Sequence, residues 1–223
     1  DKISTGRKTD KFGISAGHAL ELYRRAEKHA FVEPVGLAMH IGSQISDVSA
    51  FAGAFDYLAE ATDDMRRKGL TVSRLDLGGG LGVAYHDDEQ ELPLEDYGAL
   101  LKSLALRTDA QLTIEPGRWL VAGAGVLVTR VNAIKQAGDR RFVIVDAAMT
   151  ELMRPTLYGA YHDIKPVKEM EADALVWDVV GPVCESGDFL GQDRSLPVPD
   201  EGDLLAVFAA GAYGAVLGSS YNT

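Results

Sequence analysis

Residues 75–82 read Leu75-Asp76-Leu77-Gly78-Gly79-Gly80-Leu81-Gly82, an apolar run that breaks into glycines. Residues 72–77 are few, start on a β-branched side chain and are bounded by turn formers, which predicts a buried strand. The glycines that follow predict a loop whose N–H groups can approach one anion, because glycine accepts positive φ and has no Cβ. A phosphate group is the expected ligand of this loop. A tight strand-to-helix turn without a ligand explains three glycines equally well.

Strand and helix patterns alternate on both sides of this stretch. We expect strands at residues 11–14, 35–41, 72–77 and 111–115. Amphipathic helices are expected from Ser15 to about His29, from Val48 to Gly69 and over residues 94–106. Ser15 is the expected N-cap of the first helix, and Gly69 the residue that ends the second. Such alternation predicts parallel strands with helical crossovers, hence an α/β architecture.

Three successive strands of this half end in groups that bind anions or carry protons. The three sequences are His40-Ile41-Gly42-Ser43, Gly78-Gly79-Gly80 and Glu115-Pro116-Gly117-Arg118. In a parallel sheet or a (β/α)8 TIM barrel all these strand ends lie on one face, where such folds place their active sites. Four strand-helix units cannot close an eight-stranded barrel. The first half is therefore either a small open sheet or the second half of a barrel.

In the second half the apolar residues no longer recur at helical spacing, and the pattern predicts an all-β domain. Strand-like runs at residues 126–131, 141–146, 174–180 and 204–210 are separated by Gly, Pro and Asp. We place the domain boundary near residues 118–125, which gives an α/β domain at residues 1–120 and a β domain at 121–223. The β domain is expected to be an antiparallel sandwich or barrel.

Composition excludes several classes of protein. With 223 residues, 46% hydrophobic and 25% charged, the chain suits one large domain or two modest ones. A net charge of −11 argues against nucleic acid as a partner. The single cysteine excludes a disulfide within the chain, and no signal peptide or membrane-spanning run is visible. We therefore expect a cytoplasmic protein without membrane partners.

Six short motifs occur in a characteristic order along the chain. They are HIGSQ at 40–44, DLGGGLG at 76–82, EPGR at 115–118, MRPTLYGAYH at 153–162, GPVCESGD at 181–188 and GAYG at 211–214. Together they resemble the diaminopimelate decarboxylase family of alanine-racemase-like (fold-type III) enzymes, which depend on pyridoxal 5'-phosphate. The resemblance implies the C-terminal half of a (β/α)8 barrel followed by a β-sandwich or barrel. It also implies a fragment, because family proteins begin earlier, in a part that carries the Schiff-base lysine.

The resemblance assigns the residues that hold the cofactor. Glu115 would keep the pyridine nitrogen protonated, and His40 would lie against the ring. The phosphate would be held by Gly78, Gly79, Gly80, Ser43 and the backbone around Gly117, and Tyr213 would reach it; Pro116 and Arg118 complete the implied cofactor-binding residues. From the residues alone, Glu115 could instead be a solvated charge at a strand end. His40 could instead be a core residue with its polar atoms satisfied.

The same resemblance implies decarboxylation of meso-2,6-diaminopimelate to L-lysine, the last step of lysine biosynthesis. Recognition of a carboxylate by a planar, bidentate group calls for arginine. The implied substrate-binding residues are Arg118, Arg154, Tyr158, Glu185 and Tyr213. Arg154 could instead form a structural salt bridge. Glu185 within Cys-Glu-Ser-Gly-Asp favours the diaminopimelate branch over the ornithine branch.

Cys184 would protonate the carbanion left by carbon dioxide, so Cys184 and His40 are the expected catalytic residues; no metal is expected. An inert core cysteine is the alternative. In the family this cysteine loop completes the partner subunit's site, which implies a homodimer with shared active sites. No lysine of the chain stands at the Schiff-base position, so the fragment alone is expected to be inactive.

Three other functions stay open at this point. The chain could come from a related ornithine, arginine or carboxynorspermidine decarboxylase. It could also be a non-catalytic relative with the same fold. A dinucleotide-binding domain is disfavoured because Glu115 lies farther from the glycine loop than the ~20 residues of that pattern.

Overall fold

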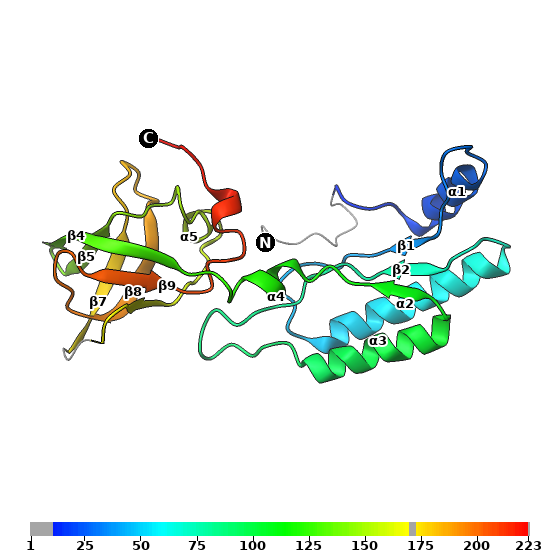
Figure 1. Cartoon of the computed structure of the whole chain (residues 1–223), viewed down its shortest axis with the longest axis horizontal. Coiled ribbons are helices and arrows are strands. Elements are labelled where there is room, and N and C mark those ends of the chain that lie inside the picture. The colour runs from blue at the N-terminus through cyan, green and yellow to red at the C-terminus, as the bar shows by residue number, and fades with distance from the viewer. Residues whose placement is uncertain (1–10, 170–172, 223) are drawn as a thin grey trace. The chain divides into compact units, whose positions relative to one another are not determined.

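The computed structural model describes residues 11–169 and 173–222, and the chain divides into two units (Figure 1). Unit 1 comprises Asp1–Val83 and Gln90–Gly117. Unit 2 comprises Ala84–Glu89 and Arg118–Thr223. The short segment Ala84–Glu89 therefore belongs to unit 2, although the chain on both sides of it belongs to unit 1.

Unit 1 contains a parallel sheet of three strands: β1 (Gly36–Ala38), β2 (Arg74–Asp76) and β3 (Gln111–Thr113). The order is β1-β2-β3, and Leu37, Leu75 and Leu112 stand side by side in its register. These strands confirm the predictions at 35–41, 72–77 and 111–115, although each is shorter. The predicted strand at 11–14 is wrong. Gly13 has a φ of +70° there, and Phe12 and Ile14 are 57% and 60% exposed, so their side chains pack on nothing that would hold a strand.

Three helices accompany this sheet: α1 (Ala16–Glu27), α2 (Val48–Arg67) and α3 (Leu94–Thr108). The hydroxyl of Ser15 accepts a hydrogen bond from the His18 N–H and caps α1, as predicted. Gly69, with a φ of +83°, follows the end of α2 in the left-handed conformation predicted for it. The buried face of α2 repeats at helical spacing and comprises Phe51, Phe55, Leu58, Ala59, Thr62 and Met65.

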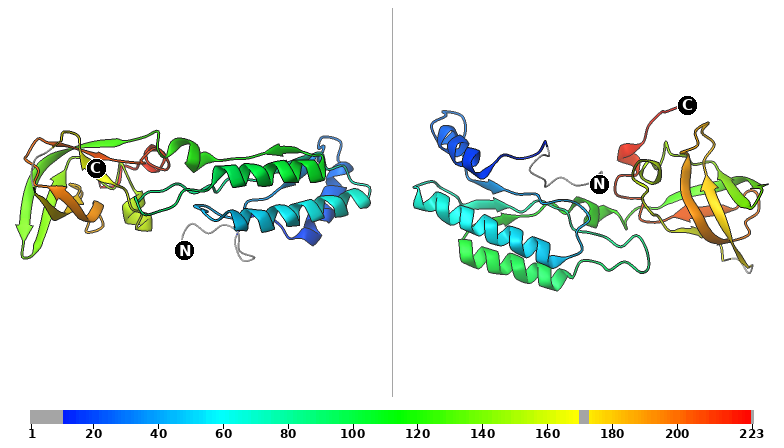
Figure 2. Two further views of the ribbon diagram at one scale, coloured as in Figure 1. Left: turned by 90° about the horizontal axis from the view of Figure 1, so that it is seen from below. Right: turned by 180° about the vertical axis from the view of Figure 1, so that it is seen from behind.

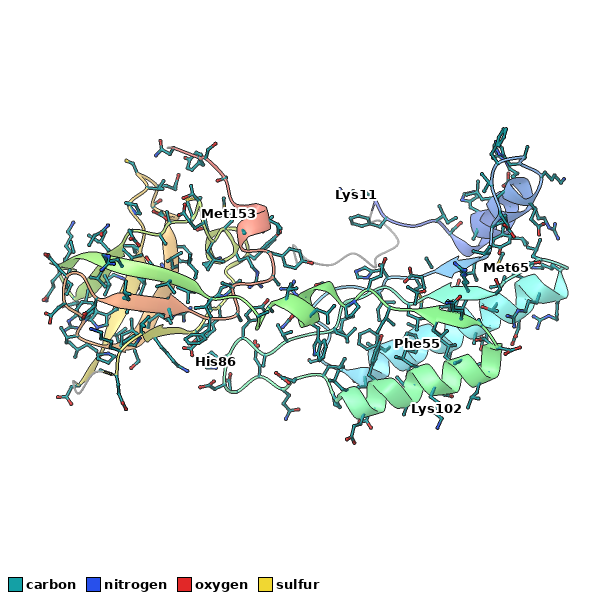
Figure 3. All side chains as sticks on the ribbon, viewed as in Figure 1. Lys11, Phe55, Met65, His86, Lys102 and Met153 are labelled. Carbon is teal, nitrogen blue, oxygen red and sulfur yellow. The ribbon has the colours of Figure 1, made fainter. Side chains whose placement is uncertain are left out.

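Helices α2 and α3 lie side by side along the sheet (Figure 2). Phe51 of α2 and Tyr97 of α3 meet with ring centroids 5.0 Å apart in an edge-to-face arrangement. Phe55 and Met65 point inward from α2, whereas Lys102 extends from the outer surface of α3 (Figure 3). This core covers one face of the strands and leaves the loops at their carboxyl ends to the candidate site.

Unit 2 is built on one sheet of six strands in the order β6-β9-β4-β5-β7-β8. The strands are β4 (Leu127–Ala137), β5 (Arg140–Val145), β6 (Ile164–Pro166), β7 (Ala174–Val180), β8 (Phe189–Pro197) and β9 (Leu204–Val207). The first and last strands of this order, β6 and β8, also contact each other, so the sheet nearly closes on itself. Four of these strands confirm the predicted runs. Sequence reasoning missed β6, which is only three residues long, and β8, which is interrupted by polar residues.

The expected purely antiparallel arrangement is wrong for one pair. β5 and β7 run parallel, with Phe142 opposite Asp178, whereas the other pairs of this sheet are antiparallel. A parallel pair requires a long crossover connection. The chain between Val145 and Ala174, which contains β6, provides it. The sheet of unit 2 is therefore mixed.

Two short α-helices were not predicted, α4 (Gly117–Val121) and α5 (Arg154–Tyr158). Five residues are too few to show a helical period in the sequence. Pro155 stands in the first turn of α5, and Gly159, with a φ of +64°, ends it. These helices carry Arg118 and Arg154. Among the described helices, none is long and apolar enough to cross a membrane.

Candidate active site

The predicted site residues fall into two groups, one in each unit. The group in unit 1 comprises His40, Ser43, Gly78, Gly79, Gly80, Glu115, Pro116 and Gly117. The group in unit 2 comprises Arg118, Arg154, Tyr158, Cys184, Glu185 and Tyr213.

In unit 1, the glycines let three strand-end loops touch through their main chains. A Cβ on Gly78 would lie 2.7 Å from the Met39 carbonyl oxygen, and one on Gly80 would lie 2.3 Å from that of Gly42. A Cβ on Gly79 would lie 2.1 Å from the Glu115 carbonyl oxygen. All three distances are too short for any side chain. The glycine loop therefore packs between the loop after β1 and the loop after β3, which brings His40 and Glu115 to its two sides.

Two of the three glycine N–H groups already have partners. The Gly78 N–H donates to Oδ1 of Asp76 at 2.9 Å, and the Gly79 N–H donates to Nδ1 of His40 at 3.4 Å. Among the described residues, the Gly80 N–H has no such partner. Accepting at Nδ1 leaves the proton of a neutral His40 on Nε2.

His40 and Glu115 both have exposed side chains. The alternative of His40 as a core residue is therefore wrong. No described side chain pairs with the Glu115 carboxylate, so it stands free at the strand end. Both groups can reach a bound molecule from this position.

In unit 2, two arginines and two tyrosines form a connected cluster. Nη1 of Arg118 donates to the hydroxyl of Tyr85 at 2.8 Å. The ring of Tyr85 lies under the guanidinium of Arg154, with Cζ 4.4 Å from the ring centroid. Tyr213 contributes a second ring, 4.9 Å from Cζ of Arg118, and adopts a φ of +57° next to Gly214. The structure thus brings Arg118, Arg154 and Tyr213 together.

Arg154 is 6% exposed, and among the described residues it has no acidic partner. Nη1 of Arg154 lies 2.8 Å from Nε2 of the fully buried His162. Burial lowers the pKa of Arg154, and the nearby positive charge of Arg118 lowers it further. Within residues 11–169 and 173–222, no carboxylate lies within ion-pair distance of this guanidinium, so the salt-bridge alternative is wrong there. A buried cation held by neutral groups is well suited to accept an anion.

Of the remaining residues of the second group, Tyr158 is the last residue of α5, whereas Cys184 and Glu185 lie on the loop between β7 and β8. The Cys184 side chain is exposed, which excludes the core alternative. Asp188 anchors the loop, because its buried carboxylate accepts from the N–H groups of Met149 at 2.6 Å and Val183 at 2.8 Å. The Glu185 carboxylate accepts from Gly187 N–H at 3.3 Å and from the Tyr221 hydroxyl at 3.4 Å, and the bond from Gly187 leads the causes that lower the pKa of Glu185. No described contact joins Cys184 or Glu185 to Arg154.

Sequence reasoning missed two members of the cluster, Tyr85 and His162. Tyr85 stands in a polar segment without a motif, so nothing in the sequence indicated its role. His162 closes the MRPTLYGAYH motif eight residues after Arg154, and this spacing was the one available signal. In the described residues, no group of three or more His, Cys, Asp or Glu side chains could hold a metal ion.

Comparisons with known proteins identify relatives that are similar to almost the whole chain. The chain is 46% identical over 221 residues to diaminopimelate decarboxylase of Vibrio cholerae, covering 99% of this chain and 53% of that protein. A crystal structure of the Helicobacter pylori diaminopimelate decarboxylase with L-lysine superposes with a TM-score of 0.93 at 40% identity, covering 99% of this chain and 55% of that one. The M. jannaschii enzyme, also in complex with L-lysine, gives 0.93 at 36% identity, covering 99% and 52%.

The chain therefore spans about half the length of the relatives it matches. Residues 23–211 match the family model described as pyridoxal-dependent decarboxylase, C-terminal sheet domain. That match extends over most of the chain and includes the predicted site residues except Tyr213. This chain belongs to the pyridoxal-dependent decarboxylase family.

Proposed function

We propose that this chain contributes to a carboxy-lyase that decarboxylates meso-2,6-diaminopimelate to L-lysine with pyridoxal 5'-phosphate. The relatives at 42% to 46% identity carry the name diaminopimelate decarboxylase. Because the chain spans about half of their length, the proposal concerns what its own residues contribute to the reaction. We also propose that unit 1 is part of a (β/α)8 barrel, of which β1, β2 and β3 are three neighbouring strands.

The uncompensated charge of Arg154 carries this proposal. Diaminopimelate has a second carboxylate at the end remote from the reacting carbon, whereas ornithine and arginine have none. A buried guanidinium with a fixed plane matches a carboxylate in geometry and charge. Arg154 would bind this remote carboxylate, with Arg118 as its neighbour and Tyr158 and Tyr213 beside them. This arrangement favours the diaminopimelate branch over the ornithine and arginine decarboxylases.

The residues of unit 1 fit a phosphorylated pyridine. Pyridoxal phosphate supplies an electron sink for the bond that loses carbon dioxide. The free carboxylate of Glu115 would hold a proton on the pyridine nitrogen, and His40 would stack against the ring. The Gly80 N–H, rather than those of Gly78 and Gly79, would face the phosphate. Ser43, Pro116, Gly117, Arg118 and Tyr213 complete the proposed cofactor-binding set.

The loop between β7 and β8 would serve the proton transfer. Cys184 would deliver a proton to the carbon that has lost its carboxylate, and its exposed position allows this. Glu185 would bind the remote amine of the substrate. We further propose that two copies share their active sites through this loop and that the protein is cytoplasmic. The isolated chain should be inactive, since its described lysines in unit 1 lie at helix ends, on helix faces or before α1, and none lies in the strand-end loops.

A chimera tests this function. The chain would replace the homologous part of the Vibrio cholerae enzyme, to which it is 46% identical. We expect the chimera to release carbon dioxide from meso-diaminopimelate and not from L-ornithine, while the 223-residue chain alone releases none. A chimera that folds and binds pyridoxal phosphate but prefers ornithine would contradict the proposal. Activity of the chain alone would contradict its inactivity.

A further inference from the structure

His162 is a buried polar residue to which the proposed reaction gives no role. Its side chain is completely inaccessible, between the guanidinium of Arg154 and the main chain of Phe208. The two ring nitrogens each have a partner at 2.8 Å, Nε2 facing Nη1 of Arg154 and Nδ1 facing the Phe208 carbonyl oxygen. Its ring also meets that of Tyr85 edge-to-face, with centroids 5.4 Å apart.

These two partners together fix the protonation of the ring. A carbonyl oxygen only accepts hydrogen bonds, so Nδ1 must carry the proton. A guanidinium only donates, so Nε2 must be the unprotonated acceptor. A second proton on Nε2 would point at the N–H of Arg154 across 2.8 Å. The contacts therefore define a neutral imidazole with its proton on Nδ1.

We infer that His162 is a positioning residue, which holds the guanidinium of Arg154 in place with a neutral acceptor and leaves its positive charge available to a carboxylate. Structural arginines are commonly held by a carboxylate, which would cancel the charge. Here the imidazole holds one edge of the guanidinium and the Tyr85 ring supports its face at 4.4 Å. The identity of the incoming carboxylate rests on the proposed function. The hydrogen bond from Arg154 to a neutral His162 is independent of that function.

The surroundings of His162 agree with this assignment. Burial lowers the pKa of His162 to about 4, and the positive charges of Arg154, Arg194 and Arg118 act in the same direction. The hydrogen bond to the Phe208 carbonyl acts in the opposite direction and is outweighed. Tyr85 is a further titratable group that faces the ring. His162 thus keeps its role throughout the physiological pH range.

Nuclear magnetic resonance on the 223-residue chain tests the hydrogen bond without any activity. We expect the ¹⁵N signals of His162 to show a protonated Nδ1 and an unprotonated Nε2 from pH 5 to pH 7.5. The Nη1 protons of Arg154, which face Nε2 of His162, should be protected from exchange. His162→Leu should abolish that protection, whereas His162→Gln, whose amide offers one acceptor and one donor, should restore most of it. A charged ring at pH 6, the opposite tautomer, or protection that survives His162→Leu would overturn the inference.

The chimera then tests why the acceptor is neutral. We expect His162→Leu to raise the KM for meso-diaminopimelate about tenfold and to change kcat by less than threefold, while His162→Gln recovers most of the affinity. His162→Glu is the decisive variant, because it still accepts from Arg154 but adds a negative charge, and it should raise KM at least as much as His162→Leu. A KM for His162→Glu close to that of the parent would overturn the role of neutrality. Thermal unfolding confirms that each variant folds. An inactive parent chimera would refute the proposed function alone, since the resonance result stands separately.

Discussion

The α-carbon of Gly79 packs against the main chain of Glu115, so closely that a Cβ would lie 2.1 Å from the Glu115 carbonyl oxygen. The Glu115 N–H donates to the Gly78 carbonyl at 2.7 Å, which ties the same two loops together a second time. The role of glycine here is close approach between neighbouring strand-end loops. The φ of Gly79 is not in the left-handed region, so space alone excludes a side chain.

Gly79→Ala should destabilise unit 1 by about 1–3 kcal/mol, because the new methyl group must push main chain apart. Helices α1, α2 and α3 all belong to unit 1, so urea unfolding followed by circular dichroism at 222 nm reports on it. Gly98→Ala is the matched control. Gly98 is an exposed position in α3 with open space around its α-carbon, and alanine there should stabilise the helix by about 0.5–1 kcal/mol. Equal effects of both substitutions would contradict the role assigned to Gly79.

The sequence predicted the elements whose pattern is long and regular. The apolar residues at helical spacing from Phe51 to Met65 predicted α2. Ser15 and Gly69 predicted helix ends that the structure confirms. The apolar residues at 11–14 led to a wrong prediction of a strand, because Phe12 and Ile14 are exposed and no strand forms there. α4 and α5 are too short to have a period. Hydrophobic pattern thus predicted what packs in the core and missed the short segments that carry Arg118 and Arg154.

The candidate site was predictable in part. The motifs pointed to Arg118, Arg154 and Tyr213, which the structure brings together. Tyr85 reaches them from a segment more than thirty residues before Arg118, a contact that no local pattern encodes. The sequence also gave no means to see that Arg154 lacks an acidic partner among the described residues. That property depends on which side chains the fold packs around Arg154, and these are His162 and Tyr85.

The stability of unit 2 should fall between pH 7.5 and pH 5 through His162. The pKa of His162 is about 4 in the folded chain and about 6.5 in the unfolded chain. Between these two pH values the unfolded chain therefore binds a proton at His162 and the folded chain does not. The free energy of unfolding therefore decreases as the pH falls below the pKa of the unfolded chain, by about 2 kcal/mol at pH 5. The two tryptophans, Trp119 and Trp177, both lie in unit 2, so their fluorescence in urea measures it. His162→Gln should lack this part of the slope. Parallel pH profiles for the two proteins would refute the prediction.

Asp188→Asn should weaken the anchor of the loop that carries Cys184. The carboxylate accepts two main-chain N–H bonds, and an amide can accept only at its single oxygen while its NH₂ faces the other donor. We expect a loss of about 1–3 kcal/mol in unit 2, measured by tryptophan fluorescence in urea. Asp193→Asn serves as control, because that side chain is 74% exposed and asparagine tolerates its φ of +53°. A difference below about 0.5 kcal/mol between the two variants would count against the anchor.

Arg154→Lys should impair binding more than turnover. Lysine keeps the charge but cannot present a planar fork, and it loses the stack on Tyr85. In the chimera with the Vibrio cholerae enzyme we expect the KM for meso-diaminopimelate to rise tenfold or more, with kcat reduced by less. Arg107→Lys provides the comparison, since Arg107 pairs with Asp56 on the surface of unit 1. Unchanged KM in Arg154→Lys would remove Arg154 from the substrate site.

Cys184→Ala should affect turnover and leave binding intact. Cys184 is the single cysteine of the sequence and is exposed, so one equivalent of a thiol reagent should react with each 223-residue chain. If its thiol delivers the proton after carbon dioxide leaves, removing it should lower kcat of the chimera by about 10²- to 10⁴-fold, with KM within a few-fold of the parent. Ser195→Ala, at an exposed position of β8, should leave both constants unchanged. A Cys184→Ala chimera that retains kcat within threefold would show that the proton comes from another group.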